Sequence, residues 1–242
     1  MKTIQYYADQ SGLELTKEQL FQFKTYQDLL IDWNQRVNLT AITDPGEIAL
    51  KHFADSLSVL PFLTEAFKKS DTRFPDVSLI DVGTGAGFPG IPLKITHPSL
   101  SVTLMDSLNK RIAFLDAVIQ ALSLKDCITV HSRAEDGAKC GDYRERFDIA
   151  VARAVAGMPV LCEYCLPFVK VGGIFAAMKS SAGEELKTAR HAIKILGGEI
   201  EACHDFKLPE SDISRSVIII RKISKTPAGY PRKAGKPEKE PL

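Results

Sequence analysis

The stretch VSLIDVGTGAGFPGIPLKI, residues 77–95, restricts the possible folds of this chain more than any other. Its first residues, 77–82, form an apolar and β-prone run that includes Asp81. Four glycines follow this run, at positions 83, 85, 87 and 90. The run predicts a buried parallel strand, and the glycines predict a tight turn that leads into a helix. Such a turn brings backbone N–H groups close to a ligand.

The spacing of these glycines is compatible with two classes of ligand. Gly85, Gly87 and Gly90 satisfy the G-x-G-x-x-G spacing of dinucleotide-binding folds. Gly83, Gly85 and Gly87 also satisfy the G-x-G-x-G spacing of methyl-donor folds. The motif alone does not decide between them, so other parts of the sequence have to.

From residue 77 onward, strand patterns alternate with helix patterns. The expected strands are 77–82, 101–106, 127–131, 147–152, 172–179, 199–206 and 216–223. The expected helices between them are 90–96, 109–123, 159–169 and 183–196. This alternation is typical of βαβ units. Only LPESDISR separates the last two strands, and so short a link predicts an antiparallel pair. The expected fold class is therefore α/β, with a doubly wound, Rossmann-like, seven-stranded and mostly parallel sheet.

The residues on either side of this core predict two further segments. Residues 1–70 predict a helical cap without strands, with helices at 16–34 and 46–69. Residues 71–224 form the expected core. Residues 225–242 form a Pro-rich tail with five basic side chains and two glutamates, a net charge of +3. This composition predicts an extended or disordered segment that contacts RNA.

Acidic residues after the first strands favour the methyl-donor interpretation. Asp81 stands two residues before Gly83, where a carboxylate could meet the cationic amino group of methionine but would repel a pyrophosphate. Asp106 ends the second strand and could accept hydrogen bonds from ribose hydroxyls, a feature of both ligand classes. Ala134 and Glu135 follow the third strand, where a backbone N–H and a carboxylate could contact adenine. The final antiparallel pair of strands also favours the methyltransferase variant of the fold over a nicotinamide-dependent oxidoreductase.

Composition limits the compartment and the partners. The five cysteines form no disulfide framework, and the N-terminus MKTIQYYADQ has no apolar signal core, so a cytoplasmic protein is expected. The most apolar long window, 147–169, contains three charged residues, which argues against a membrane span. The five histidines have no metal-ligand spacing, and no metal is expected. Because the net charge is only +1, an anionic partner would need a local basic patch.

The residues that could act on a methyl acceptor are few. No cysteine follows a proline, as carbon-5 pyrimidine methylation would require, and the fourth strand ends in VARAVAGMP, which lacks the Pro-Pro-aromatic motif of amine methylases. Arg153 lies there instead, and its guanidinium could hold a phosphate or the O6 and N7 edge of guanine. Guanine N7 needs no base, so a ring-nitrogen target is mildly favoured. Asn38 and His52 either close the site over the target or serve only as a turn cap and a core hydrogen-bonding group.

Several blocks together carry a resemblance to a known family. They are NLTAITDP (38–45), KHFADSL (51–57), LIDVGTGAGFPGIPLKI (79–95), DSLNKRIAFL (106–115), SRAED (132–136) and ARAVA (152–156). With them the chain resembles the small-subunit ribosomal RNA methyltransferase G family, once called glucose-inhibited division protein B.

The resemblance covers nearly the whole chain, including the PRKAGKP motif of the tail. It implies S-adenosyl-L-methionine as the cofactor and N7 of a guanine in 16S ribosomal RNA as the target, with free rRNA or the 30S subunit as the partner of a monomer. The positions that match the family's cofactor-binding residues are Gly83, Phe88, Ala134, Glu135 and Arg153. A nicotinamide-dependent oxidoreductase and a non-catalytic RNA-binding module are the alternatives.

Overall fold

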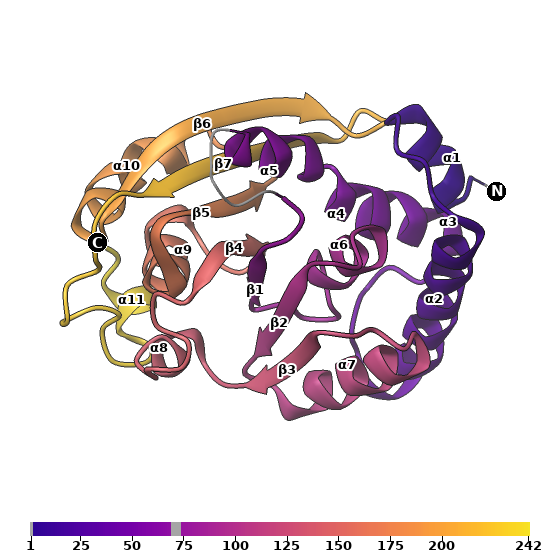
Figure 1. The fold of residues 1–242 in the computed structure, drawn as a ribbon, viewed down its shortest axis with the longest axis horizontal. Coiled ribbons are helices and arrows are strands. Elements are labelled where there is room, and N and C mark those ends of the chain that lie inside the picture. Colours follow the sequence, from indigo (N-terminus) through magenta and orange to yellow (C-terminus); the bar gives the residue numbers. More distant parts are fainter. Residues whose placement is uncertain (1, 69–73) are drawn as a thin grey trace.

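A seven-stranded sheet with the order β3-β2-β1-β4-β5-β7-β6 organises the chain (Figure 1). The computed structural model describes residues 2–68 and 74–242. Its strands are β1 (Ser78–Val82), β2 (Ser101–Asp106), β3 (Cys127–His131), β4 (Phe147–Arg153), β5 (Val169–Lys179), β6 (Gly198–Lys207) and β7 (Ser214–Lys222). The first five are parallel to one another. β7 is antiparallel to both β5 and β6. The predicted fold class and the predicted antiparallel final pair are confirmed.

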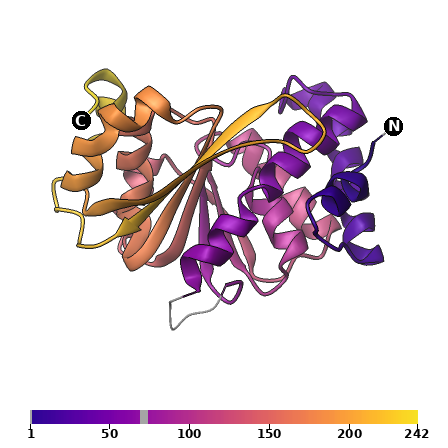
Figure 2. The same ribbon diagram turned by 90° about the horizontal axis from the view of Figure 1, so that it is seen from above.

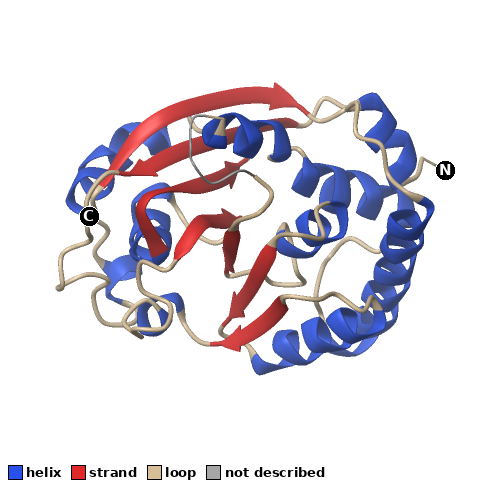
Figure 3. Cartoon of the chain, in the orientation of Figure 1, coloured by secondary structure: helices blue, strands red, loops and turns tan. Residues whose placement is uncertain are grey.

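Helices precede, separate and follow these strands (Figure 3). Their bounds are α1 (Ile4–Gln10), α2 (Lys17–Val37), α3 (Pro45–Ile48), the π-helical η1 (Ala49–Ala54), α4 (Asp55–Leu57), α5 (Leu60–Phe67), α6 (Gly90–Thr96), α7 (Asn109–Ala121), α8 (Ala134–Gly137), α9 (Met158–Cys165), the 3₁₀ turn η2 (Leu166–Phe168), α10 (Gly183–Ile195) and α11 (Lys236–Lys239). Within the described ranges, none of them has the length and apolar character needed to cross a membrane.

The helices cover the sheet on both faces, as Figure 2 shows. One hydrophobic cluster joins the N-terminal helices, α6 and α7 to one face. A second cluster joins α9 and α10 to the other face. Neighbouring residues of β1 serve both clusters, since Leu79 belongs to the first and Ile80 to the second. A strand covered on both faces needs a nearly continuous apolar run, which is why β1 could be located from the sequence.

The direction of the strand order reverses between β1 and β4. Helix α6 follows β1 on one face, and α9 follows β4 on the other. The loops after these two strands therefore diverge and leave a space outside their carboxyl ends. In doubly wound sheets this is the place where ligands bind.

The N-terminal helices share their core with the sheet. Helix α2 begins with a capping box, in which Thr16 and Gln19 bond to each other's backbone. Its side chains Phe23, Tyr26 and Leu30 are fully buried in the cluster that also contains β1 and α6. The predicted separation between residues 70 and 71 lies outside the described residues, and the division into three segments stays a prediction.

Two expectations for the N-terminal helices need correction. The stretch 46–69 is not one helix, because α3, η1, α4 and α5 divide it, and its last residue lies outside the described part. The π-helical η1 contains His52 and directly precedes Asp55. Helix α1 has no counterpart among the sequence-based expectations. A helix of this length gives too few turns for a periodic pattern to be recognised.

The C-terminal tail is also different from the expectation of an extended or disordered segment. Residues 225–242 pack along α8 and α9, where Figure 1 shows the yellow end of the chain. Arg232 forms a two-pronged ion pair with Glu163 of α9, at 2.6 and 2.9 Å. Glu163 is fully buried, so it needs such a partner, and the tail supplies it. Composition alone could not reveal this pairing.

Candidate active site

A cavity of about 360 Å³ lies at the carboxyl ends of β1, β2, β3 and β4. Its lining residues come from these strand ends and the loops after them, from α7, α8 and α9, and from the tail. They are Val82, Gly83, Met105, Asp106, Ser107, Arg111, Ser132, Arg133, Ala134, Glu135, Ala154, Val155, Tyr164, Gly235 and Glu238. Its size is within the range of small-molecule sites. Four predicted cofactor-binding residues, Gly83, Asp106, Ala134 and Glu135, meet in this cavity.

The glycine-rich turn approaches the cavity by its backbone. Gly83, Gly85 and Gly87 all have positive φ angles, of 70°, 62° and 97°. A Cβ atom on Gly83 would lie 2.9 Å from Cγ2 of Val155, so a side chain there would collide with the opposite wall. Because this position combines a positive φ angle with no space for a Cβ atom, only glycine fits it without strain.

Asp81 lies beneath the turn and does not line the cavity. Its Oδ2 accepts hydrogen bonds from the hydroxyl of Thr84 at 2.7 Å and from the backbone N–H of Gly90 at 2.8 Å. Its Oδ1 is buried and has no hydrogen-bond partner among the described residues. Burial raises the pKa of Asp81 to about 6, although these hydrogen bonds oppose the shift. The visible role of Asp81 is therefore to hold the turn against α6.

Asp106 lies at the cavity edge, as the end of β2 predicted. Its Oδ2 accepts a hydrogen bond from the backbone N–H of Gly85 at 3.0 Å and from Nη1 of Arg111 at 3.1 Å. Arg111 itself lies in the cavity lining. Its Nε is buried without a partner among the described residues, which makes it a candidate hydrogen-bond donor.

Glu135 is buried where α8 begins, and part of its carboxylate is engaged by the tail. The backbone N–H of Gly235 donates a 2.9 Å hydrogen bond to Oε1 of Glu135. Nearby, the hydroxyl of Tyr164 donates to Oε1 of Glu238 at 3.3 Å. The sequence did not indicate that the tail reaches this wall. The hydrogen bond joins residues 100 positions apart in the sequence, and a local sequence pattern cannot predict such a contact.

Arg153 lines a second cavity, of about 330 Å³, which meets the first at Ala154. The lining of this second cavity is rich in cationic side chains. It consists of Lys51, His52, Asp55, Arg153, Ala154, Met178, Lys179, Ser180 and Arg215. Ala154 has a φ angle of 56°, a conformation that a residue with a side chain rarely adopts. It turns the chain at the point where the two cavities adjoin.

The buried carboxylate of Asp55 organises the second cavity. Nη1 of Arg153 donates to its Oδ2 at 2.8 Å, and Nε of Arg215 donates to its Oδ1 at 2.8 Å. Arg153 also donates to the backbone carbonyl of Lys51 at 3.1 Å. Arg153 is thus part of an ion pair, and both of its members line this cavity. Sequence patterns did not single out Arg215, which enters from β7.

An aromatic cluster lies behind the lining of the second cavity. Phe88 stacks on His52 with ring centres 4.5 Å apart and lies 5.1 Å from the guanidinium carbon of Arg153. The ring centre of Tyr26 lies 5.4 Å from that of Phe88, and its hydroxyl donates a hydrogen bond to the carbonyl of Ala86 in the glycine-rich turn. Phe88 lines neither cavity and supports the groups that do. Helix α2 is thereby tied to the turn.

His52 is an uncharged hydrogen-bonding group at neutral pH. Burial, together with the nearby charge of Arg153, lowers the pKa of His52 to about 4. Its Nε2 lies 2.8 Å from the hydroxyl of Thr40, and its Nδ1 is buried without a partner among the described residues. The ring therefore presents a neutral nitrogen beside the second cavity.

Asn38 lies away from both cavities. It ends α2 in a left-handed conformation with φ of 50°, and its side chain is exposed. This is the turn-cap role considered for it. Asn34, which the sequence reading overlooked, holds the following loop through its side chain, at 2.6 Å from the N–H of Leu39 and 2.8 Å from that of Thr40.

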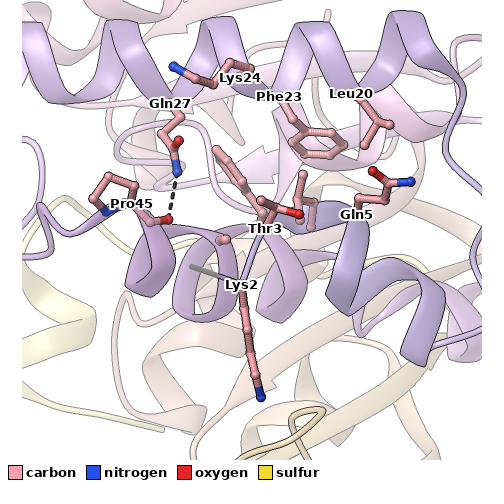
Figure 4. A pocket seen from close by; sticks show the side chains of 11 residues that line it. Lys2, Thr3, Gln5, Leu20, Phe23, Lys24, Gln27 and Pro45 are labelled. Atoms are coloured by element: carbon pink, nitrogen blue, oxygen red, sulfur yellow. Dashed lines mark hydrogen bonds between the residues drawn. The ribbon is translucent and has the colours of Figure 1, made fainter.

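Another cavity, of about 230 Å³, lies between the start of the chain, α2 and α3 (Figure 4). A hydrogen bond of 2.8 Å from Gln27 to the carbonyl of Pro45 crosses it. None of the residues described there is a carboxylate, histidine or cysteine, and no strand end reaches it. Over residues 2–68 and 74–242, no group of three or more potential ligand side chains is arranged to hold a metal ion.

Solved structures share the fold of this chain. Precorrin-6y C5,15-methyltransferase from Geobacter metallireducens matches with a TM-score of 0.50 at 16% identity, over 68% of this chain and 87% of that one. TYW2 from M. jannaschii, solved in complex with AdoMet, matches with a TM-score of 0.51 at 13% identity, over 70% and 77%. At such low identity the likeness concerns the fold alone, and that fold is the class I methyltransferase fold.

Sequence comparison identifies the family. A family model described as rRNA small subunit methyltransferase G matches residues 19–214. The Ribosomal RNA small subunit methyltransferase G of Acetivibrio thermocellus is 55% identical over 231 residues, 96% of this chain and 92% of the relative. That of Lachnoclostridium phytofermentans is 52% identical over 232 residues, with coverage of 96% and 93%. The chain belongs to the ribosomal RNA small subunit methyltransferase G family, which confirms the resemblance found in the sequence.

Proposed function

We propose that this protein transfers a methyl group from S-adenosyl-L-methionine to N7 of a specific guanine in 16S ribosomal RNA. The observation that carries the proposal is the pair of adjoining cavities. One has a glycine-rich turn and a ribose-type carboxylate, and the other has cationic walls. Their common residue is Ala154. A donor and an acceptor bound on its two sides would be held close together, which is the main contribution an enzyme makes to methyl transfer.

The first cavity fits the cofactor by its donors and acceptors. The absence of a side chain at Gly83 leaves room for close approach by a ligand. Asp106 offers acceptor oxygens for ribose hydroxyls, and Ala134 and Glu135 lie where the adenine base would bind. The cofactor, when bound, supplies an electrophilic methyl group on a sulfonium centre. Asp81 could act on the methionine amino group only through its buried Oδ1 or through the turn.

The second cavity fits an RNA base that needs no deprotonation. Its carboxylate, Asp55, is held by Arg153 and Arg215 and is not free to act as a base. Guanine N7 has a lone pair at neutral pH, so it reacts without one. We assign Arg153 to the guanine, through its phosphate or O6. His52 forms the neutral wall beside it, and Asn38 is assigned only to the turn after α2.

The cationic residues at this cavity provide the local attraction that a net charge of +1 does not. Lys51 and Arg215 are partly exposed at its rim and are suited to phosphate contacts. The family membership supports neither of the two alternative functions, the nicotinamide-dependent oxidoreductase or the non-catalytic RNA-binding module. Action on 30S particles, a monomeric state and a cytoplasmic location stay predictions.

The proposal is tested by the modification itself. N7-methylguanine would be mapped by mass spectrometry in 16S rRNA from cells with and without this protein. We expect one N7-methylguanine to disappear and to return when the purified protein and S-adenosyl-L-methionine are added to 30S particles. An unchanged modification pattern, or a methyl group on another atom, would exclude the N7 assignment.

A further inference from the structure

The C-terminal segment from Lys225 to Leu242 is fixed to the molecule at several places along its length. The guanidinium of Arg144 donates to the backbone carbonyls of Thr226 at 2.9 Å and of Tyr230 at 2.8 Å. The backbone N–H of Thr226 donates to Oε1 of Glu145 at 2.8 Å. Bonds to backbone groups such as these hold the path of the segment, whatever its side chains do.

The strongest attachment lies further along the segment. The buried carboxylate of Glu163 receives hydrogen bonds from the guanidinium of Arg232 and also from its backbone N–H, at 2.7 Å. Removing one partner from such a pair leaves a buried charge without compensation, which is strongly unfavourable. Pro231 and Pro237 are buried on either side of this attachment. The segment is therefore held against α9 just before it reaches the first cavity.

Beyond Arg232 the segment becomes part of the cavity wall. Gly235 and Glu238 line the cavity beside Ala134 and Glu135, at its adenine side. The N–H of Gly235 holds Oε1 of Glu135 at 2.9 Å. Gly235 has a φ angle of 79°, which glycine adopts without strain and other residues do not. This conformation directs the N–H toward Glu135 and begins α11.

We propose that the C-terminal segment is a working part of the cofactor site, in which Gly235 fixes the carboxylate of Glu135 and Glu238 closes the adenine side. The inference rests on the proposed use of the first cavity for S-adenosyl-L-methionine. It gives the tail a role different from the RNA contact that its charge predicted. Because the segment forms one wall, binding of the cofactor and docking of the tail have to strengthen each other.

The first test compares two identical substitutions within the segment. Gly235→Ala and Gly229→Ala each add one methyl group at a position where a Cβ would meet nothing within 4 Å. Only Gly235 has a positive φ and donates to Glu135. Calorimetry with S-adenosylhomocysteine should show about fivefold weaker binding for Gly235→Ala, the order of the penalty for a left-handed L-residue, and wild-type binding for Gly229→Ala.

The second test uses the unchanged full-length protein. Trypsin cleaves after Lys233, which is exposed, and after Lys207, which is exposed in the hairpin between β6 and β7. Saturating S-adenosylhomocysteine should slow cleavage after Lys233 at least threefold, on the linkage argument, and leave cleavage after Lys207 unchanged. This measurement remains decisive even if Gly235→Ala fails to fold.

These experiments distinguish a failure of this inference from a failure of the proposed function. Equal affinities for the two glycine variants, or equal cleavage after Lys233 with and without the ligand, overturn the role of the segment while S-adenosylhomocysteine still binds the wild type. A wild-type protein that does not bind S-adenosylhomocysteine at all overturns the proposed function instead.

Discussion

Replacing Asp81 by asparagine should change how the stability of the protein depends on pH. The side chain is fully buried, and one oxygen accepts both hydrogen bonds that hold the glycine-rich turn. An asparagine has the same shape, and its amide oxygen can accept the same two bonds. What the substitution removes is the buried negative charge, whose cost appears in the pKa of Asp81, raised by burial to about 6 from 3.8.

The size and sign of the effect follow from this pKa. Below pH 3.8 Asp81 is protonated in both the folded and the unfolded protein. As pH rises toward 6, the unfolded chain releases this proton first, so the folded state loses relative stability through that window. A rise of roughly two pKa units corresponds to a loss of roughly 3 kcal/mol in the free energy of unfolding, complete above pH 6.

Urea unfolding of wild type and Asp81→Asn between pH 4 and 7 measures this difference, with the fluorescence of the single tryptophan, Trp33, as the signal. The free energy of unfolding of the variant, relative to that of wild type, should rise by roughly 3 kcal/mol as the pH increases across this range. Asp148→Asn is the contrasting variant. Burial raises the pKa of Asp148, but hydrogen bonds from Lys170 and Ser78 outweigh that effect and lower the pKa below 3.8. This carboxylate is therefore ionised in both the folded and the unfolded protein over most of the range, and the difference between Asp148→Asn and wild type should stay nearly constant.

Parallel curves of the free energy of unfolding against pH for wild type and Asp81→Asn would refute the reasoning. They would show that ionisation of the buried carboxylate does not destabilise the folded protein. The same variant also decides the sequence-based role of Asp81 in the cofactor site. Loss of S-adenosylhomocysteine affinity by about tenfold or more would indicate a direct charge pairing with the amino group. Unchanged affinity would restrict Asp81 to holding the turn.

Three further predictions concern the rest of the site. Gly83→Ala should weaken S-adenosylhomocysteine binding more than tenfold by collision with the opposite wall, whereas Gly85→Ala, which has open space around its Cβ, should weaken it only about fivefold through backbone strain; equal calorimetric losses would contradict this. Arg153→Lys should lower methyl transfer to 30S particles about tenfold or more with a thermal midpoint near wild type, since lysine keeps the charge beside Asp55 but lacks the planar guanidinium proposed to hold the guanine; a collapsed midpoint would indicate a purely structural ion pair. Burial lowers the pKa of Lys222 to about 8, so chemical denaturation should show wild type gaining stability relative to Lys222→Met between pH 8 and 10, and a constant difference would argue against a buried ammonium.

The sheet could be predicted closely because burial leaves a regular trace in the sequence. Strands β2 and β3 have the predicted bounds, and the others differ from prediction by a few residues at their ends. Each central strand is covered on both faces, so its apolar run is continuous and is bounded by turn residues. The glycine-rich turn was recognisable for a related reason, since its positive φ angles require glycine at fixed positions.

The polar parts of the site were predicted only in part. Asp106, Glu135 and Arg153 follow strand ends, and their position could be inferred from the topology. Arg215 and Gly235 reach the cavities from segments far along the chain, where single polar residues carry no periodic signal. The tail illustrates the same limit. Its composition suggested disorder, but one buried glutamate on α9 gives its arginine a fixed place.

The bond between Asp55 and Arg215 also sets an order of events during synthesis of the protein. These residues are 160 positions apart, which corresponds to roughly 8 to 32 seconds of elongation at about 5–20 residues per second. Strand β7 lies between β5 and β6 in the sheet, so β6 cannot take its place before β7 has been made. A growing chain therefore has its glycine-rich turn early and gains the complete cationic cavity only when most of its length has left the ribosome.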